Sequence, residues 1–401
     1  MEDRQTGASG WGRERVFAVA WTFLLVVAVL GVTLRALVLW PVDGVRYAYV
    51  LHAHSHLGFL GWVFNAFVVV AWWQFAGRVT DRFFRRLFVV LQVANVGMLA
   101  SFPVQGYGPV SIAFSTLHMT GSAVFAWRLW RRGEAAPLVR PWLRAALVLM
   151  LISGLGPLTL GPLAAMDLRE SPWYAMSIYF YLHFQYNGWF VFFVLAAWMQ
   201  MSGVHPAVDA GRVRLAWWGL AVGCVGSFAL SALWMEPPGW VFVVALGGGV
   251  AQVLGLAVWL REFAGGTRRF GDRPGRWLAV LALAMLAVKM VLQVVGAVPV
   301  AAALVNERFV VIGFLHLVFL GVVTPLLIAW AREAGWMPRG WRTSLGIAAF
   351  LLGAGWTLVV LFGVPVALVP GGAALSMLLA AAVVMLVGVA VAFPVRPARG
   401  G

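Results

Sequence analysis

The chain has 401 residues, of which 62% are hydrophobic and only 11% charged, with a mean hydropathy of +0.90. These values exclude an ordinary soluble domain, in which roughly a quarter of the residues are charged. A formal net charge of +15 would suggest nucleic acid as the partner of a soluble protein. In so apolar a chain we expect instead the lipid bilayer as partner and no nucleic acid.

Twelve apolar segments are long enough to cross the hydrocarbon core, which takes roughly 20 helical residues. A barrel strand needs about ten residues and alternates, so the pattern predicts an all-α polytopic membrane protein. No linker or low-complexity tract divides the chain, which predicts one transmembrane domain over residues 1–401. The predicted spans are 16–40, 50–74, 85–102, 109–130, 142–164, 173–202, 213–234, 239–263, 276–300, 308–331, 341–365 and 369–393.

Arginines lie mainly on one side of the predicted membrane. Of the 28 arginines, 24 fall in the two termini and in the loops that follow even-numbered spans. The positive-inside rule then predicts cytoplasmic termini in a bacterial-type inner membrane, with residues 1–15 as a short cytoplasmic segment. The apolar stretch after residue 15 is too long for a cleaved signal, so we expect a retained anchor. The single cysteine, Cys224, excludes an intrachain disulfide.

Six of the seven histidines lie in spans that enter from the outer face, each within roughly the first ten residues of its span. All six are therefore expected in the outer half of the membrane or near its midplane. An imidazole is costly inside a bilayer and suggests a functional site, although a hydrogen bond between helices is the structural alternative. His205 lies in a cytoplasmic loop and needs no special role. The six are His52, His54 and His56 in span 50–74, His118 in 109–130, His183 in 173–202 and His316 in 308–331.

The second span carries histidines on two faces. His52 and His56 are four residues apart and share a face, a spacing that lets two imidazoles bind one metal ion. His54 is two residues from either and points to nearly the opposite side. The second span can therefore serve two different neighbours.

Three histidines open the same short phrase, 127 and 133 residues apart, which indicates an internal repeat in three copies. In each copy an aromatic residue stands three positions after the histidine and a glycine five positions after it. The glycine allows close approach of a helix or of a flat ligand. The repetition favours the ligand interpretation of the histidines. The copies are His56, Phe59 and Gly61; His183, Tyr186 and Gly188; and His316, Phe319 and Gly321.

Lys289, the only lysine, lies in the middle of span 276–300 with Gln293 one turn beyond. A buried lysine can lose its proton, so a proton path is one interpretation, and a salt bridge or a snorkelling side chain is the other. Gln185 and Asn187 stand next to His183, and we expect them to orient it.

The helix count and the positions of the histidines resemble subunit I of the heme-copper oxidases. The phrase His54-Ser-His56-Leu-Gly-Phe-Leu-Gly61-Trp62 is similar to the second helix of stand-alone, oxidase-subunit-I-like bacterial proteins. His52-Ala-His54 is similar to a motif of the NnrS family, membrane heme and copper proteins connected with nitric oxide stress. The resemblance implies three pseudo-repeated four-helix arcs, a low-spin heme between the second and tenth helices, and a copper partly held by the sixth.

The chain departs from that family pattern at several places. Span 213–234 has no histidine to complete a copper site, and span 308–331 has only His316 where the family has two. Tyr186 follows its histidine by three residues rather than four, and no arginine pair precedes the last span. The departures argue against a full oxygen or nitric oxide reduction centre.

The ligand set that remains fits one low-spin heme b, with His316 and either His56 or His54 as axial ligands. The repeat favours His56. Copper or another transition metal is the second cofactor implied, near His118 and His183. The metal-ligand candidates are His52, His56, His118, His183 and His316.

Three arginines on the outer side are candidates for pairing with heme propionates, since arginine favours charge-assisted contacts to carboxylates. They are Arg35, Arg46 and Arg308. Pairing with Asp43 or Glu307 is the alternative.

The function implied is electron transfer, or the handling of nitric oxide or another small gas, without full oxygen reduction. If the chain is an enzyme, it is an oxidoreductase, with quinol or a cytochrome subunit as the donor. One alternative is a heme or metal transporter, although transporters usually show inverted repeats rather than three copies in one orientation. Another is a structural or assembly subunit with a degenerate oxidase fold.

Overall fold

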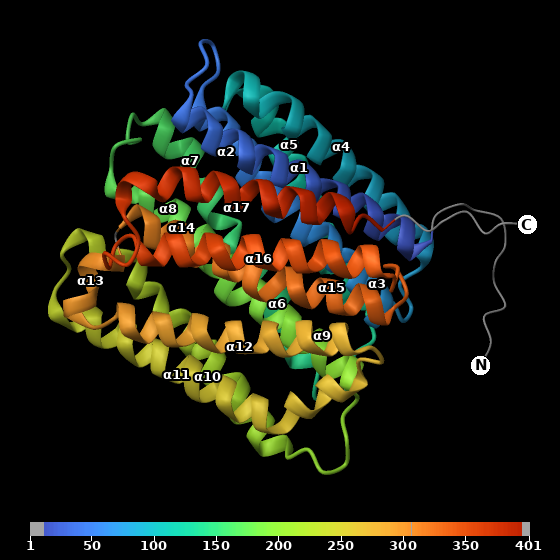
Figure 1. Cartoon of the computed structure of the whole chain (residues 1–401). Helices are drawn as coiled ribbons and strands as arrows, with labels where there is room; N and C mark the ends of the chain where they lie inside the picture. Colours follow the sequence, from blue (N-terminus) through green and yellow to red (C-terminus); the bar gives the residue numbers. More distant parts are fainter. Residues whose placement is uncertain (1–11, 306, 395–401) are drawn as a thin grey trace, which may run out of the picture.

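The computed structural model describes residues 12–305 and 307–394, and every regular element in these ranges is helical. The helices run side by side in one bundle, with the first, α1, against the last, α17 (Figure 1). The first half comprises α1 (Arg13–Leu39); α2, η1 and α3 (Tyr47–His56, Leu57–Phe64 and Asn65–Gln74); α4 (Asp81–Gln105); α5 (Pro109–Arg132); α6 and α7 (Arg140–Ser153 and Leu155–Ala165); and α8, η2 and α9 (Pro172–His183, Phe184–Trp189 and Phe190–Ser202).

The second half repeats this construction of long helical rods, some of them interrupted. It comprises α10 and η3 (Ala210–Ser227 and Phe228–Met235); α11 and η4 (Gly239–Phe263 and Ala264–Arg269); α12 (Arg273–Gly296); the short α13 (Pro299–Val305); α14, η5 and α15 (Arg308–His316, Leu317–Val323 and Thr324–Glu333); α16 (Trp341–Gly363); and α17 (Gly371–Val391). Each predicted span therefore coincides with a helical rod to within a few residues at most of its ends.

Within the described residues, ten rods are long and apolar enough to cross a membrane, which makes the chain a multi-pass membrane protein. The two other predicted spans, 109–130 and 173–202, are also helical, as α5 and as α8 with η2 and α9. They are less apolar because they carry polar residues such as His118, Gln185 and Asn187. Crossing by all twelve rods, the four-helix arcs and the cytoplasmic termini stay predictions.

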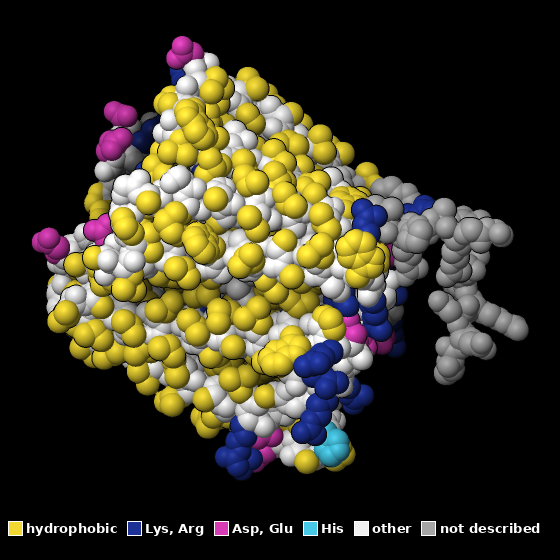
Figure 2. All heavy atoms as spheres, viewed as in Figure 1, with side chains coloured by type: hydrophobic (Ala, Val, Ile, Leu, Met, Phe, Trp, Pro, Cys, Tyr) yellow, Lys and Arg dark blue, Asp and Glu magenta, His cyan; other side chains and the backbone are white. Residues whose placement is uncertain are grey.

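The surface has the charge distribution of a membrane protein. Figure 2 shows apolar side chains over most of the visible face, with Lys and Arg side chains gathered at one end. Most Asp and Glu side chains in this view lie at the opposite end. Such a band between two polar ends is what a bilayer requires of a helical bundle.

Three helices form the centre of the bundle: α3, α9 and α15 are buried along almost their whole length. Their burial on every side separates these helices from the lipid that surrounds the bundle. The Phe67 and Phe193 rings of α3 and α9 stack with centroids 4.4 Å apart. Trp62 Nε1 of η1, which leads into α3, donates to Thr324 Oγ1 of α15 at 2.9 Å. The three rods with the repeated phrase are thus the central ones.

Each central rod changes from α- to π-helix directly after its histidine. The π-helical segments η1, η2 and η5 begin at Leu57, Phe184 and Leu317. A π segment is rare and commonly marks a functional site, since it inserts one residue into a regular helix. The three sequence copies therefore share a local backbone feature that the residue pattern alone does not predict.

At each repeated glycine, a side chain of the helix that precedes the central rod packs against the glycine α-carbon. A Cβ built on Gly61 would lie 2.8 Å from Phe23 Cδ1 of α1, and one on Gly188 would lie 2.8 Å from Leu149 Cβ of α6. At Gly321 the nearest atom of the preceding helix is Met285 Cγ of α12, at 3.3 Å. Helix packing, rather than a flat ligand, therefore explains these three glycines.

We expect the Gly188→Ala protein to be less stable by about 1–3 kcal/mol, the usual cost of overpacking a tight core. The new methyl group would meet the Cβ of Leu149, which cannot move without its helix. The matched control is Gly355→Ala in α16, where no atom lies within 4 Å of the added Cβ. Unfolding in detergent micelles, followed by tryptophan fluorescence, measures both. Equal stability of the two variants would contradict the packing role.

Candidate functional site

His54 lies on the side of α2 that faces α1. Its Nδ1 donates a hydrogen bond to the Val27 carbonyl oxygen at 3.0 Å. A Cβ built on Gly31 of α1 would lie 3.3 Å from His54 Cε1 and 3.4 Å from Arg35 Nη1. The imidazole and the guanidinium therefore border the same glycine, and a larger side chain there would displace one of them.

His316 of α14 faces the same place. Its Nδ1 donates to the Ile312 carbonyl oxygen at 2.8 Å, and its ring lies close enough to Arg35 and His54 to interact electrostatically with both. We call Arg35, His54 and His316 the arginine group. It joins the first helix to the second and tenth predicted spans.

The guanidinium group of Arg35 is only partly hydrogen-bonded among the described residues. Nη1 donates to the Gly31 carbonyl oxygen at 2.8 Å, whereas Nε is buried and has no hydrogen-bond partner among the described residues. No carboxylate lies within ion-pair distance of this guanidinium in residues 12–305 and 307–394. Because an unpaired buried charge is strongly destabilising, the arginine group is suited to an anionic ligand.

His52 and His56 lie on the other side of α2. His56 Nδ1 donates to the His52 carbonyl oxygen at 2.9 Å, and the Tyr107 hydroxyl lies 3.4 Å from His56 Nε2. The Tyr107 ring is 4.5 Å from the His52 ring, and the Phe102 ring is 4.4 Å from the His56 ring, between centroids. Two histidines and a tyrosine thus gather beside the turn between α4 and α5.

His118 of α5 is almost completely buried beside the same rod. Its ring packs against Phe64 with centroids 5.1 Å apart and lies next to the carbonyl group of Leu60, one turn after His56. The Ser122 hydroxyl donates to the His118 carbonyl oxygen at 2.9 Å, and its oxygen lies 3.3 Å from His118 Nδ1. Nε2 is buried without a partner among the described residues.

His183 is bonded on both sides of its ring. Asn187 Nδ2 donates to His183 Nδ1 at 3.1 Å, and His183 Nε2 donates to the Cys224 carbonyl oxygen at 2.8 Å. Lys289 Nζ donates in turn to Asn187 Oδ1. Each group thus donates to the next: Lys289 to Asn187, Asn187 to His183, and His183 to a backbone oxygen. We call Lys289, Asn187 and His183 the lysine chain.

The acceptor at the end of the lysine chain arises from a change of helix type. The α-helix α10 ends at Ser227 and continues as the 3₁₀-helix η3, in which Phe228 N–H bonds to the Val225 carbonyl. The Cys224 carbonyl therefore lacks its usual partner four residues on. His183 supplies that hydrogen bond, which ties the sixth rod to the seventh.

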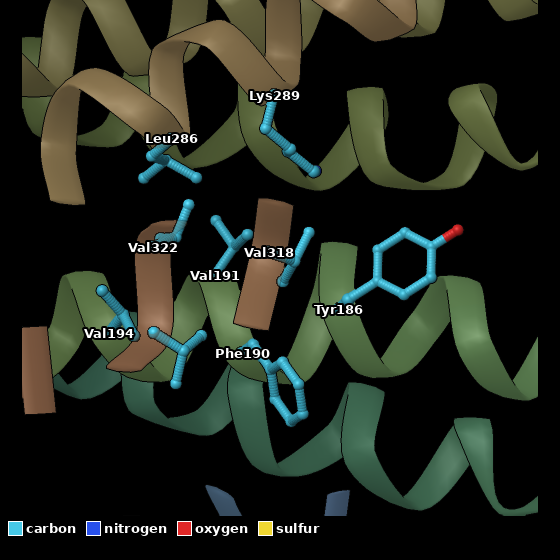
Figure 3. A pocket seen from close by; sticks show the side chains of 9 residues that line it. Tyr186, Phe190, Val191, Val194, Leu286, Lys289, Val318 and Val322 are labelled. Atoms are coloured by element: carbon cyan, nitrogen blue, oxygen red, sulfur yellow. The ribbon is translucent and has the colours of Figure 1, made fainter. Parts of the chain in front are cut away.

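Lys289 is completely buried and points from α12 toward the helices of Tyr186 and Val318 (Figure 3). It borders an apolar cavity of about 10 Å³, which is just enough for one water. Its hydrogen-bond partner is an amide, and among the described residues it forms no salt bridge. It therefore neither snorkels to the surface nor pairs with a carboxylate.

Three histidines share one tautomer and His183 differs. In His54, His56 and His316, Nδ1 carries the proton that is donated to a carbonyl oxygen, so Nε2 keeps an unprotonated lone pair. This is how most metal-binding histidines are held, with the far ring nitrogen fixed by a hydrogen bond. His183 has no such lone pair in this conformation, because Nε2 is its donor and Nδ1 is already an acceptor.

The remaining predicted site residues lie apart from these groups. Arg46 is exposed at the start of α2, where it donates to the Tyr49 hydroxyl at 2.9 Å, and Arg308 is exposed at the start of α14. Gln185 donates to Ser153 Oγ of α6 at 2.9 Å rather than orienting His183. Gln293 is buried one turn from Lys289, and its Oε1 has no partner among the described residues.

The residue pattern did not predict Tyr107, Ser122 or the separation of the histidines into groups. One signal for the lysine chain was present. Asn187 stands four residues after its histidine, where the two other copies have Leu60 and Leu320. A buried amide at that position indicates that the middle histidine has a different partner.

Within residues 12–305 and 307–394, no three His, Cys, Asp or Glu side chains meet in a group that could hold a metal ion. Instead, His316 lies near His54 on one side of α2, and His118 lies near His56 on the other. Comparison with known proteins finds no family model and no curated protein that matches this chain. Its function is therefore inferred from the chemistry of these side chains.

Proposed function

We propose that the chain is a heme-binding membrane protein of the heme-copper oxidase subunit I kind that transfers electrons without reducing oxygen. His54 and His316 would be the axial ligands of one low-spin b-type heme, with Arg35 beside a propionate. His54 replaces His56 in this role because it lies in the arginine group, whereas His56 faces Tyr107. A bound heme would supply a one-electron carrier.

The unpartnered Nε of Arg35 is the observation that carries this proposal. Heme has two carboxylates. A half-buried guanidinium would pair with one of them, and the two neighbouring imidazoles would hold the iron through Nε2. Val27 and Ile312 fix the two rings through backbone oxygens. The chain's own residues thus orient both imidazoles before any cofactor binds.

The test is the absorption spectrum of the purified protein, oxidised and dithionite-reduced, expressed with ample heme. We expect a six-coordinate low-spin spectrum that is lost in His54→Ala and His316→Ala and kept in His56→Ala. His205→Ala, in an exposed loop, is the matched control. Arg35→Met should bind heme more weakly and lower its reduction potential, because a positive charge near the iron favours the ferrous state.

A colourless wild-type protein would contradict the heme proposal and favour a transporter or an assembly subunit. Loss of the spectrum in His56→Ala, with retention in His54→Ala, would instead return the ligand role to the histidine of the repeated phrase. Unchanged heme content in Arg35→Met would remove the anionic contact from the proposal.

A further inference from the structure

An apolar groove runs along the lipid-facing side of α4. It has a volume of about 800 Å³, is open to the outside and is lined almost entirely by apolar atoms. Val89, Val93, Val96, Ala100 and Val104 recur every three or four residues along it, and all five are exposed. This stretch of helix rises by about 22 Å, which exceeds the roughly 15 Å depth of one leaflet of the hydrocarbon core. The groove is therefore long enough for a whole acyl chain.

Close packing of α4 and α5 fixes one wall of this groove. Phe114 of α5 forms the wall, and its ring lies so close to Gly97 of α4 that a Cβ there would overlap the ring. Further along the same two helices, a Cβ built on Gly121 of α5 would lie 3.1 Å from Leu91 Cδ2 of α4. The two helices are therefore held together at a glycine on each, which keeps the wall in place beside α4.

Arginines continue the groove beyond Val89. Arg86 and Arg82 stand about one and two turns before Val89 on the same face of α4, because residues three or four apart are neighbours on a helix. Arg128 of α5 reaches the same place, since its guanidinium carbon lies 5.6 Å from the centroid of the Phe83 ring of α4. We call Arg82, Arg86 and Arg128 the groove arginines. Three positive charges from two helices thus lie at one end of an apolar groove.

The groove arginines have no counter-ion among the described residues. None of them forms a salt bridge within residues 12–305 and 307–394, and Arg128 Nε is buried without a hydrogen-bond partner there. Two nearby acids have other partners: Asp81 accepts from Trp72 Nε1 at 2.6 Å, and Glu134 pairs with Arg78. The end of the groove is therefore complementary to a ligand with an anionic head and an apolar tail.

We propose that the groove binds one acyl chain of an anionic phospholipid, whose phosphate lies among the groove arginines. Arg82 lies in the first turn of α4 and Arg128 close to the end of α5, at the depth of lipid headgroups, while the groove lies in the hydrocarbon. Basic pockets between transmembrane helices bind anionic headgroups, and arginine pairs with phosphate through two parallel hydrogen bonds. A zwitterionic headgroup also carries a cation, which the arginines repel. This lipid site does not depend on the heme.

The test is native mass spectrometry of the full-length protein, titrated with dioleoyl phosphatidylglycerol and with dioleoyl phosphatidylcholine, which have identical chains. We expect the first phosphatidylglycerol to bind more tightly than phosphatidylcholine. Arg86→Gln and Arg128→Gln should each weaken phosphatidylglycerol binding about fivefold, the usual contribution of one arginine beside an anionic lipid, and leave phosphatidylcholine binding unchanged. Arg86→Lys should recover most of the affinity, because it keeps the charge.

Ala100→Phe tests the acyl chain. Its ring would occupy the groove, so it should weaken the binding of both lipids. Two matched controls should bind both lipids like the parent. Arg342→Gln removes an exposed arginine at the start of α16, and Ala380→Phe enlarges an exposed alanine of α17, both away from the groove. All five substituted positions are at least partly exposed, and elution as a monodisperse protein checks that each variant is folded.

Equal affinity of the parent for the two lipids, or equal effects of Arg86→Gln and Arg342→Gln, would overturn the headgroup site. Phosphatidylglycerol binding that survives Ala100→Phe would overturn the place of the chain. A co-purifying isoprenoid quinone that phosphatidylglycerol does not displace, or a dimer that Ala100→Phe dissociates, would assign the groove to another occupant. Lipid affinity is measured whether or not the protein holds heme, so none of these results bears on the proposed function.

Discussion

Replacing Asp272 with alanine is expected to lower the free energy of unfolding by about 3–5 kcal/mol, the usual effect of removing one partner of a buried ion pair. Asp272 Oδ2 accepts from Arg332 Nε at 2.8 Å and from Arg332 Nη2, while Oδ1 caps α12 by accepting from Gly275 N at 3.2 Å. The Arg332 side chain is only 2% exposed. The substitution leaves that guanidinium buried without a counter-ion.

Asp209→Ala is a matched control for Asp272→Ala. Asp209 also caps a helix, α10, and also lies near an arginine, Arg212, but both side chains are largely exposed. The backbone N–H groups of Arg212 and Gly211 hold the pKa of Asp209 below its usual value. Its contribution to stability is therefore present at neutral pH and is lost only as the pH falls through that lowered pKa.

SDS-induced unfolding in mixed micelles, at neutral pH, measures both aspartate variants. We expect a much smaller change for Asp209→Ala, because water solvates the exposed arginine. The double variant Asp272→Ala/Arg332→Met should recover part of the loss, since it buries no unpaired charge. Equal losses in the two single variants would show that helix capping, rather than the buried ion pair, is the source of the effect.

Asn187→Leu is expected to be the other strongly destabilising substitution. It removes the acceptor of Lys289 and the donor to His183 in one step, although leucine is what the two other copies of the phrase carry. Each buried group left without a partner costs roughly 1–3 kcal/mol, and more when it is charged. We expect a total loss of about 3–5 kcal/mol in the same unfolding assay.

Lys289→Met tests the same chain from its other end. Methionine has nearly the shape of lysine and leaves only Asn187 Oδ1 without a donor, so the loss should be about 1–3 kcal/mol and smaller than for Asn187→Leu. If Lys289 serves a proton path, this variant stays folded but loses proton-coupled activity. A larger loss of stability for Lys289→Met than for Asn187→Leu would contradict the order of donors in the lysine chain.

The helical rods could be predicted from the sequence because the bilayer imposes a minimum apolar length. Span 173–202, for example, ends within one residue of α8 and α9 at both ends. The interruptions could not be predicted in the same way. The 3₁₀-helix η3 and the three π segments depend on contacts between rods, such as the hydrogen bond from His183 to the Cys224 carbonyl.

The sequence predicted which residue types form the candidate site, but not which of these residues lie next to one another. The spacing of His52, His54 and His56 correctly indicated two faces of one helix, because side-chain direction follows from helical geometry. The partner of each face could not be derived, since Arg35 belongs to α1 and Tyr107 to the turn between α4 and α5. The repeated phrase also suggested equal roles for its histidines. His183 differs, because its Nε2 donates to the Cys224 carbonyl of another helix, whereas His56 and His316 donate through Nδ1 within their own helices.

Each π segment divides its central rod into two helical sections. The rotation of one section relative to the other about the helix axis depends on the number of residues in the π segment. The section after each π segment is fixed by close packing on all sides, while the section before it carries the histidine. One residue of an α-helix corresponds to a rotation of about 100°. Loss of a single residue from η1 would therefore rotate α2 by about this angle relative to α3, and Ala53 would take the place of His54. A one-residue change in length, with no change in residue type, would be enough to change which side chain of α2 lies beside Arg35.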